Sequence, residues 1–431
     1  VFRLRGKGIP VLNGRGRGDQ YVTVVIETGG AAQWQNEVID GSLLQRYVYD
    51  SEGLTLVDEQ PSASMGDSET LEEFLRFARE NYPADRTAVV FWNHGGGSVS
   101  GAAFDELYDY DSLTLDEMYA AFSQVWEPSL EAGQQPVELV GFDTCLMATV
   151  DVAYTFCDLS RYLVASEETE PANGWYYSQW VQALANDPSM DGAALGKVIC
   201  DAYYEGCEAV ETQDSATLSV TDLTKIQGLL DAYEEFGAQA LSAAAQDPGF
   251  LSRFSRAAAG TENYGGNTRE QGYTNMVDLG GIARHTADTL PGAQAVLDAL
   301  DECVLYQVNG KYRSEGTGLS CYYSYSGDVD DLNGYIQQGA GAAFKYLYAY
   351  QLTGQLDQDT PAVFITGINS QGIAVTDILV WQEDAGLVNA ALDRSTGLST
   401  ATAPYRQLTP QDINGDGITE LPRPDRSVSD T

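Results

Sequence analysis

The chain has 431 residues, and 63 Asp and Glu against 23 Lys and Arg give a formal net charge of -40. Nucleic-acid binding is excluded because it depends on basic side chains that neutralise phosphates, and anionic membrane surfaces would repel the chain for the same reason. The hydrophobic fraction of 43%, with 10% aromatic residues, is too high for a disordered acidic chain, so most of the sequence is expected to fold. The charge instead favours basic peptides or basic proteins as partners.

The length permits two or three domains of about 150 residues each, or one large α/β domain with an appendage. The longest apolar runs, 21–26 and 87–92, have the length of strands, whereas a membrane-spanning helix needs about 18 apolar residues. The first residues are polar and Gly-rich, so no signal peptide is expected in this chain. The six cysteines include no C-x-x-C pair, and with two histidines they lack the spacing of a zinc site, so reduced thiols are expected.

The first third of the chain begins irregularly. Residues 1–20 are rich in Gly and hold five of the 23 basic residues, so an irregular basic arm is expected there. A buried strand is predicted over 21–27 and a hairpin over 46–57, around a polar turn that contains Gly. The apolar residues that follow Ser68 recur at helical spacing, which predicts a helix over 68–81.

From residue 87 onward, apolar strands alternate with helical segments. Strands are predicted over 87–92, 137–142, 162–166, 217–223 and 316–324. Helices are predicted over 113–122, 146–156, 177–207 (with a break near Pro188), 225–259, 290–305 and 335–350. Strands that are apolar on both faces and alternate with helices indicate a mostly parallel sheet flanked by helices, which is an α/β fold. After residue 358 the pattern changes to short β-like runs, so the main domain is expected over 21–355 and a small β-rich C-terminal appendage over 356–431.

Two of the predicted strands end in reactive side chains. The strand over 87–92 runs into Asn93, His94 and three glycines, and the strand over 137–142 runs into Asp143, Thr144 and Cys145. Because the carboxyl ends of parallel strands meet at one edge of a sheet, His94 and Cys145 are expected to meet there. An imidazole that accepts the thiol proton produces a nucleophilic thiolate and later protonates the leaving amine.

Two further features favour this chemistry. A helix predicted to begin at Leu146 would place Cys145 at its N-terminus, where the partial positive charge favours a thiolate. The backbone N–H groups of Gly95 and Cys145 are candidates for an oxyanion hole. The alternative is structural, because a cysteine at a strand end is more often a small buried apolar residue than a nucleophile. The other histidine, His285, lies in a polar stretch and is expected at the surface.

The motifs Phe-Trp-Asn-His-Gly-Gly-Gly at 91–97 and Gly-Phe-Asp-Thr-Cys-Leu-Met at 141–147 resemble the two catalytic motifs of clostripain-like cysteine peptidases. These enzymes belong with caspases, gingipains and legumains. Segments at 166–175, 275–280 and 318–323 also resemble the family, and the similarity spans roughly residues 21–350. The resemblance implies a caspase-haemoglobinase-like three-layer sandwich, that is, a caspase-like peptidase domain.

The resemblance also implies residue roles. Cys145 would be the nucleophile and His94 the base of a cysteine endopeptidase that cuts after Arg or Lys through an acyl-enzyme intermediate. Asp143 matches the acidic residue credited in the family with binding the basic side chain before the scissile bond, and a carboxylate suits that partner. A strand-end cap without a ligand is the alternative for Asp143. Glu168 and Glu170 either line the same cleft or form a solvated acidic loop.

The chain departs from the family pattern at its beginning. The family usually opens with a strand and a helix before the strand at Tyr21, and here the basic arm stands in that place. That strand is normally interior to the sheet. A second hypothesis is therefore a catalytically inactive clostripain-like binding protein of the cell surface. In either case the family implies a secreted or bacterial cell-surface location.

Calcium is the one metal that the sequence suggests, because some family members depend on it. Asp412, Asn414, Asp416 and Glu420 resemble the alternating oxygen ligands of a calcium loop. The twelfth position is Arg423 instead of a bidentate Glu, so the helix-loop-helix pattern is incomplete and a plain turn is the alternative. The Cys/His chemistry itself needs no cofactor, and calcium bound there would order the C-terminal appendage.

Overall fold

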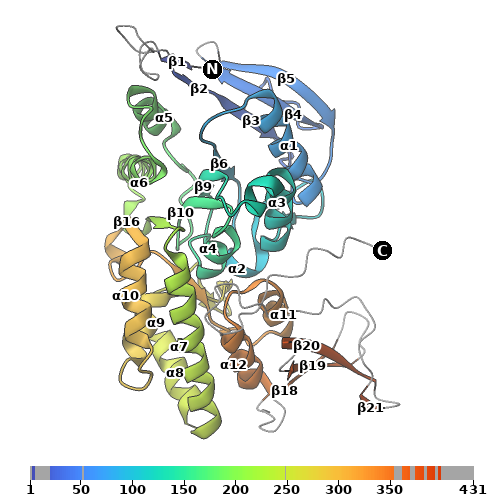
Figure 1. Ribbon diagram of the computed structural model, residues 1–431, viewed down its shortest axis with the longest axis vertical. Coiled ribbons are helices and arrows are strands. Elements are labelled where there is room, and N and C mark those ends of the chain that lie inside the picture. Colours follow the sequence, from blue (N-terminus) through green and yellow to red (C-terminus); the bar gives the residue numbers. More distant parts are fainter. Residues whose placement is uncertain are drawn as a thin grey trace. The chain divides into compact units, whose positions relative to one another are not determined.

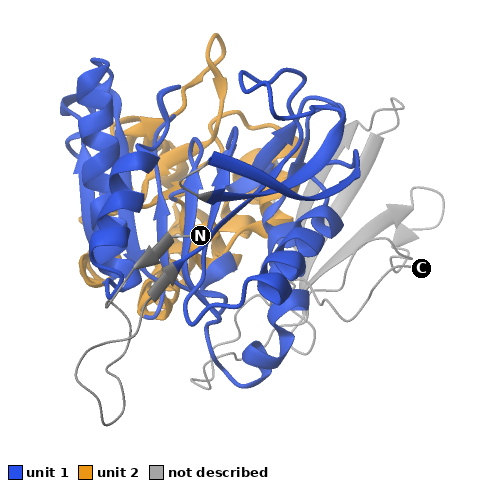
Figure 2. Cartoon of the chain, turned by 90° about the horizontal axis from the view of Figure 1, so that it is seen from above, with its two compact units in different colours: residues 1–148, 155–224, 303–318 blue, residues 149–154, 225–302, 319–431 orange. Residues whose placement is uncertain are grey.

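The computed structural model describes residues 2–4, 20–50, 53–247, 249–353, 362–368, 374–382, 386–393 and 397–398. The chain divides into two compact units, which Figure 2 distinguishes by colour. Unit 1 comprises 1–148, 155–224 and 303–318, and unit 2 comprises 149–154, 225–302 and 319–431. The candidate peptidase residues from His94 to Glu170 all lie in unit 1.

The centre of unit 1 is a five-stranded sheet with the order β16-β11-β10-β9-β6, and Figure 1 labels all of these strands except β11. Its strands are β6 (Ala88–Trp92), β9 (Val137–Asp143), β10 (Ser160–Ala165), β11 (Thr217–Asp222) and β16 (Val304–Asn309). Strands β6, β9 and β10 are parallel, whereas β11 and β16 each pair antiparallel with their neighbours. The predicted α/β class is confirmed. The sheet is mixed rather than mostly parallel, because continuous apolar character reports burial on both faces but not the direction of a strand.

Helix α3 (Leu115–Glu131) covers one face of this sheet. Phe122 of α3 lies 6.3 Å from Phe91 of β6 between ring centroids, and Phe91 stacks on Phe142 of β9 at 4.9 Å. The helix extends beyond its predicted end at Phe122, but it kinks at the buried Trp126, whose φ of -115° and ψ of 22° are not helical. The contacts of Phe91 with Phe122 and Phe142 fix the position of β6 against β9 on this face of the sheet.

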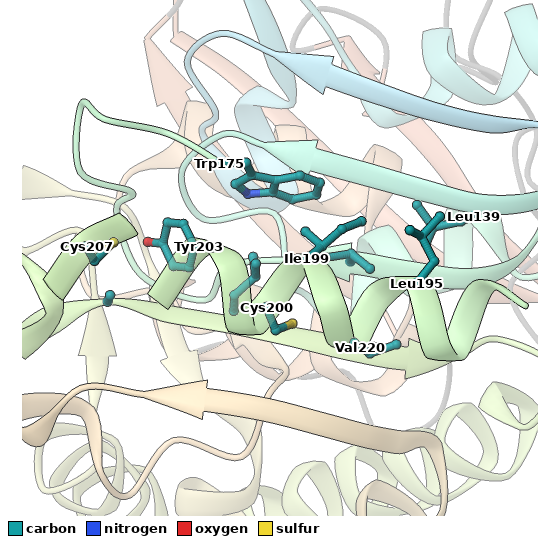
Figure 3. Packing of buried hydrophobic residues seen from close by; sticks show 11 residues of the cluster. Leu139, Trp175, Leu195, Ile199, Cys200, Tyr203, Cys207 and Val220 are labelled. Carbon is teal, nitrogen blue, oxygen red and sulfur yellow. The ribbon is translucent and has the colours of Figure 1, made fainter. Parts of the chain in front are cut away.

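Helix α6 (Gly192–Ala209) covers the opposite face (Figure 3). Leu195 and Ile199 of α6 pack in one buried cluster with Leu139 of β9 and with Trp175, which Figure 3 shows between the helix and the sheet. Successive side chains of a strand alternate between faces, so Gly141 and Asp143 lie on the same face as Leu139. Helices on both faces make this part of unit 1 a three-layer arrangement, as the resemblance implied.

The helical stretch predicted over 177–207 is interrupted, as expected, near Pro188. It consists of α5 (Tyr177–Asn186) and α6. None of the six cysteines, all of which lie in the described part of the chain, forms a disulfide, and Cys200 and Cys207 are both buried on α6.

The N-terminal segments of unit 1 form a separate antiparallel sheet of β3 (Val24–Thr28), β4 (Leu43–Asp50) and β5 (Gly53–Pro61). The hairpin predicted over 46–57 is confirmed by the pairing of β4 with β5. The buried strand predicted over 21–27 is wrong in its bounds and burial. β2 (Gln20–Val22) pairs with β1 (Phe2–Leu4), and β3 is only half-buried because it lies at the edge of its own sheet.

Helix α1 (Ser68–Asn81) confirms the helix predicted over 68–81. Its Phe77 lies under the guanidinium of Arg46 in β4, at 4.9 Å from the ring centroid. Its Arg79 donates to the carbonyl oxygen of Val125 in α3. The helix therefore connects the N-terminal sheet with the layer that covers β6.

Unit 2 is mostly helical. Its described elements include α7 (Ile226–Gln246), α8 (Phe250–Ala259), α9 (Leu279–Thr286), α10 (Ala293–Cys303), α11 (Val329–Gln338) and α12 (Ala342–Thr353). Tyr233 of α7 stacks on Phe344 of α12 with 4.5 Å between ring centroids. The single helix predicted over 335–350 is in fact two helices, because the chain turns at Gly339–Gly341. None of the described helices has the length and apolarity to cross a membrane.

Three strands of unit 2 form the small sheet β12 (Asn263–Tyr264), β15 (Met276–Asp278) and β17 (Ser320–Tyr322). β17 confirms the late strand, but it belongs to this sheet and not to the central one. The helix predicted over 290–305 ends at Cys303, and the residues that follow form β16 of unit 1. The sequence prediction missed β16 because its short apolar run fits a helix as well as a strand.

The C-terminal β-like runs form β18 (Ala362–Ile368), β19 (Ala374–Gln382), β20 (Gly386–Asp393) and β21 (Gly397–Leu398), paired antiparallel in that order. The strands expected there are confirmed. The calcium loop predicted at Asp412, Asn414, Asp416 and Glu420 lies outside the described residues, as does most of the basic arm.

Candidate active site

The two motif-bearing strands are neighbours in the sheet. β6 and β9 pair in parallel, and their last pair is Trp92 with Asp143. His94 and Cys145 each lie two residues beyond that pair. The structure therefore places the candidate base and the candidate nucleophile at the same end of two adjacent strands.

The backbones of the two motifs touch at Gly95. A Cβ at this position would lie 2.1 Å from the carbonyl oxygen of Cys145 and 2.8 Å from Oγ1 of Thr144. A real Cβ does not approach a carbonyl oxygen so closely, so only Gly fits here. Gly95 faces Ala102 in an isolated antiparallel bridge.

The candidate oxyanion donors differ in their surroundings. In the Gly95 bridge the hydrogen bonds are donated by Gly96, at 2.7 Å, and by Ala103, at 3.1 Å. The N–H of Gly95 has no acceptor among the described residues. Among the described residues, the backbone N–H of Cys145 contacts only the sulfur atom of its own side chain. The Gly95 donor is therefore available to a bound oxygen atom.

Cys145 and His94 have different exposures. Cys145 is half-buried, and its Sγ accepts a hydrogen bond from the backbone N–H of Glu170 at 3.2 Å. His94 is exposed, and no described residue forms a hydrogen bond with its imidazole ring. The thiol is therefore held in place by the loop that follows β10, while the imidazole faces solvent.

The helix predicted to begin at Leu146 is wrong in its start. α4 (Val150–Phe156) begins four residues later, and Leu146 has a left-handed φ of 66°. The intervening residues instead pair with the loop after β10, because Leu146 donates to Glu168 at 3.2 Å and Ala148 donates to Ser166 at 2.9 Å. Cys145 is consequently not at a helix N-terminus.

The electrostatic surroundings of Cys145 do not favour a thiolate. Burial raises the pKa of the Cys145 thiol above its ordinary value, and the carboxylates of Glu168 and Asp143 raise it further. The hydrogen bond from Glu170 acts in the opposite direction but does not outweigh burial. The thiol is therefore neutral in the resting protein, and a base is needed to activate it.

Asp143 is almost fully buried, with 4% of its surface exposed. Its Oδ1 accepts the backbone N–H of Trp175 at 3.0 Å, and its carboxyl lies in hydrogen-bond reach of Tyr177 and Glu170. Burial raises the pKa of Asp143, and these hydrogen bonds partly oppose that increase. Gly174 has a φ of 57°, and a Cβ there would lie 3.0 Å from Oδ1 of Asp143.

Glu170 contacts Trp175 as well as Asp143. Its Oε1 accepts the ring N–H of Trp175 at 3.2 Å. Burial, followed by the Asp143 charge, raises the pKa of Glu170 well above its ordinary value. The Trp175 ring rests on Gly141, where a Cβ would lie 2.9 Å from the indole. Sequence reasoning missed this role of Trp175, although Trp175 belongs to a segment that resembled the family.

Glu168 has a different environment from Glu170. It is 4% exposed, and its carboxylate forms an ion pair with Arg313. Its Oε1 also accepts the backbone N–H of Thr169 at 2.7 Å. The structure thus gives Glu168 a basic partner inside the chain. No pattern in the sequence predicts this role for Arg313, because Arg313 is distant from Glu168 in the chain and follows β16, which was not predicted.

Two remaining sequence expectations concern His285 and metals. His285 is exposed, as expected, and its Nδ1 lies 2.8 Å from Oγ1 of Thr261. Over the described ranges, no group of three or more His, Cys, Asp or Glu side chains is arranged to hold a metal ion.

Comparison with known proteins identifies the family. The model of the clostripain family matches residues 22–359. Clostripain from Hathewaya histolytica is 34% identical over 100 residues, which is 22% of this chain and 19% of clostripain. The chaperone protein DnaJ of Ruminiclostridium cellulolyticum is 78% identical over 27 residues, which is 6% of this chain and 7% of DnaJ. The matched parts thus span less than a fifth of these relatives' own lengths.

Two solved structures of secreted C11 cysteine proteases from Bacteroides thetaiotaomicron share the fold. The one named iotapain has a TM-score of 0.51 at 17% identity and covers 70% of this chain and 84% of its own. The other, in complex with an irreversible peptide inhibitor, has a TM-score of 0.53 at 16% identity and covers 74% of this chain and 88% of its own. The caspase-like fold is therefore confirmed, and with the family match over residues 22–359 the chain belongs to the clostripain family.

Proposed function

We propose that this chain is a cysteine endopeptidase that hydrolyses peptide bonds after Arg or Lys through a Cys145–His94 dyad and an acyl-enzyme intermediate. Membership of the clostripain family supports the peptidase reaction. The observation that carries the dyad is the pairing of Trp92 with Asp143, because it brings the segments that bear His94 and Cys145 to one end of two adjacent strands.

In the first half of the reaction, His94 accepts the proton of the Cys145 thiol as the sulfur attacks the scissile carbonyl carbon. The carbonyl oxygen becomes an oxyanion, for which the N–H groups of Gly95 and Cys145 are the donors. The intermediate collapses, the carbon–nitrogen bond breaks, and the imidazolium of His94 gives its proton to the leaving amine. The acyl group remains on Cys145 as a thioester.

In the second half, His94 accepts a proton from a water molecule that attacks the thioester. The carboxylic acid product leaves, and the thiol of Cys145 recovers its proton from His94. This order of events agrees with a thiol whose pKa is raised by burial, because such a thiol needs a base at the moment of attack. Base catalysis of this kind contributes about 10²- to 10⁴-fold to the rate.

The buried carboxyl of Asp143 is the proposed partner of the basic side chain. It stands two residues before the nucleophile, and a buried carboxylate suits a guanidinium or an ammonium group. Glu168 is better placed to position the loop after β10, since its carboxylate already pairs with Arg313. We further propose a secreted or cell-surface location, because the two structural relatives are secreted proteases.

The test uses fluorogenic peptides that vary at the residue before the scissile bond. Cys145→Ala should abolish hydrolysis, and His94→Ala should lower kcat by about 10²- to 10⁴-fold. Cys157→Ala, which changes the other half-buried cysteine, and His285→Ala are the matched controls and should retain activity. Asp143→Asn should lower kcat/KM for Arg peptides by about 10- to 100-fold. Activity that survives Cys145→Ala would refute the dyad.

A catalytically inactive clostripain-like binding protein is the second candidate. The observation that favours it is the position of β6 at the edge of the central sheet, with Trp92 64% exposed beside the candidate site. An arginyl chloromethyl ketone separates the two candidates. Selective alkylation of Cys145 supports the peptidase, and alkylation no faster than that of Cys157 supports the inactive protein.

A further inference from the structure

Asp143 and Glu170 bring two carboxyl groups together beside the candidate nucleophile. The two carboxyls lie within hydrogen-bond reach of each other. Trp175 holds both, since its backbone N–H donates to Asp143 at 3.0 Å and its ring N–H donates to Glu170 at 3.2 Å. The backbone N–H of Glu170 in turn donates to Sγ of Cys145 at 3.2 Å. The pair is therefore held directly next to the sulfur.

Neither carboxyl has a basic partner in the described part of the chain. Asp143 is 4% exposed, Oδ2 of Asp143 and Oε2 of Glu170 are buried, and no described N–H group donates to either oxygen. The neighbouring buried acid differs, because Glu168 pairs with Arg313. Two ionised carboxylates in contact and without a cation are unstable in a buried site, so one of them retains a proton.

The titratable groups around the pair are phenols and thiols. They come from α5, from α6 and from the segment after β9, and they are Tyr177, Tyr203, Cys200 and Cys145. Burial raises the pKa of each of these groups, so all are neutral near neutral pH. The site thus holds a single negative charge that nothing in its immediate surroundings neutralises.

Two further features suit a bound cation. Tyr203 is fully buried, and its hydroxyl forms no hydrogen bond with a nitrogen or oxygen atom of a described residue. Tyr177, whose hydroxyl is buried against Asp143, keeps 38% of its surface exposed, so this residue lies between the buried pair and the molecular surface. A buried hydroxyl without a nitrogen or oxygen partner and two buried carboxylate oxygens without N–H donors are the groups that a guanidinium or ammonium would satisfy.

We propose that Asp143 and Glu170 share one proton in the empty protein and that a guanidinium or ammonium side chain of the substrate replaces this proton. The inference rests on the proposed function and adds Glu170 to Asp143 as a second specificity-determining carboxylate. In the exchange the shared proton passes to solvent, and N–H groups of the cation donate to Oδ2 of Asp143 and Oε2 of Glu170. No covalent bond to carbon or sulfur changes.

The exchange makes cation binding depend on pH. A proton and a cation compete for the pair, so a cationic ligand binds more tightly as the pH rises through the range in which the shared proton is lost. The same competition predicts that each bound cation releases up to about one proton. A pocket with one permanently ionised carboxylate would release none.

The experiment measures proton release by calorimetric titration of the full chain carrying Cys145→Ala with agmatine, which reproduces the arginine side chain. Titrations near neutral pH in phosphate and in Tris differ in buffer ionisation enthalpy, so the difference in apparent enthalpy counts the released protons. We expect close to one proton for each agmatine bound. With Glu170→Gln added, we expect no proton release and about tenfold weaker binding.

Glu168→Gln is the matched control on the same loop, and it should leave the proton count unchanged because Arg313 already neutralises Glu168. If Glu170→Gln does not fold, as judged by circular dichroism, the pH dependence of agmatine affinity in the Cys145→Ala protein decides alone. Binding that is independent of pH and releases no proton would overturn the inference, while hydrolysis after Arg by the wild type would leave the proposed function intact. Absence of agmatine binding would overturn the inference, and absence of hydrolysis would overturn the proposed function separately.

Discussion

Gly95 lies directly against Cys145, because a Cβ on Gly95 would come within 2.1 Å of the Cys145 carbonyl oxygen. The histidine motif and the cysteine motif therefore depend on the absence of a side chain at one position. This contact keeps the backbone that follows His94 next to the backbone of the nucleophile. A displacement here would move the candidate base and one oxyanion donor together.

Gly95→Ala tests this contact. The added methyl group must push the two motifs apart, and a shift of about 1 Å at a catalytic group costs on the order of 10²-fold in rate. We expect kcat/KM for an Arg peptide to fall by at least that factor while the fold is retained. Gly228→Ala in α7 is the control, because beyond the adjacent backbone of its own helix nothing lies within 4 Å of the added Cβ. Equal activity of Gly95→Ala and wild type would contradict the contact.

The raised pKa of Cys145 predicts how the thiol reacts in the absence of substrate. Because burial holds the pKa above its ordinary value, the rate of alkylation by iodoacetamide should still be rising with pH near pH 9. Mass spectrometry after short exposures at a series of pH values would follow the modification of Cys145. A plateau reached below neutral pH would indicate a thiolate–imidazolium pair in the resting protein instead.

Arg313→Ala tests the ion pair that holds the loop after β10. The substitution leaves the carboxylate of Glu168 buried and unpaired, because its side chain is only 5% exposed, and such a loss costs about 3–5 kcal/mol. Urea unfolding would measure the change. Arg76→Ala removes an exposed ion pair with Glu72 and should cost less than about 1 kcal/mol.

The double variant Arg313→Ala with Glu168→Leu completes this test. Removing both charges should restore much of the free energy of unfolding, since no buried charge is then left without a partner. If the double variant is as unstable as Arg313→Ala alone, the loss comes from packing around Arg313 and not from the unpaired carboxylate.

Glu27 predicts a pH dependence of the free energy of unfolding. Burial raises the pKa of Glu27 from 4.5 to about 7, even though its side chain contacts Arg46 at 2.6 Å. Stability associated with the protonated carboxyl is therefore fully present below pH 4.5 and is lost as the pH rises to about 7.

Glu27→Gln removes this titration because an amide stays neutral. Relative to the wild type, the variant should gain about 3 kcal/mol between pH 4.5 and pH 7, at 1.36 kcal/mol for each unit of pKa shift. Urea unfolding of both proteins at several pH values measures the difference. A difference that stays constant over this range would mean that Arg46 keeps Glu27 ionised throughout.

Several elements were predictable because their signals are local. The capping residue and apolar spacing of 68–81 predict α1, and the continuous apolar run before His94 predicts β6. The apolar run before Cys145 predicts β9 in the same way. Strand ends of this kind also predict which edge of the sheet carries the reactive residues.

Other features escaped prediction because they depend on the partner of a segment. Leu146 fits a helix by composition, but its N–H donates to Glu168, so α4 starts later. The apolar residues of β11 predict a strand but not its direction. The antiparallel pairing of β11 with β10 and β16 is known only from the folded sheet. Local patterns contain no information about such pairings.

The sequence by itself determined the class of fold, the positions of the strands that carry His94 and Cys145, and the family to which these motifs belong. These follow from the periodicity of apolar residues and from motifs within a few residues of each other. Only the tertiary structure decided that Glu168 is neutralised by Arg313 while Asp143 and Glu170 face each other without a cation. The reason is physical: the charge state of a buried carboxyl depends on which groups the fold brings next to it, and those groups are distant in the chain.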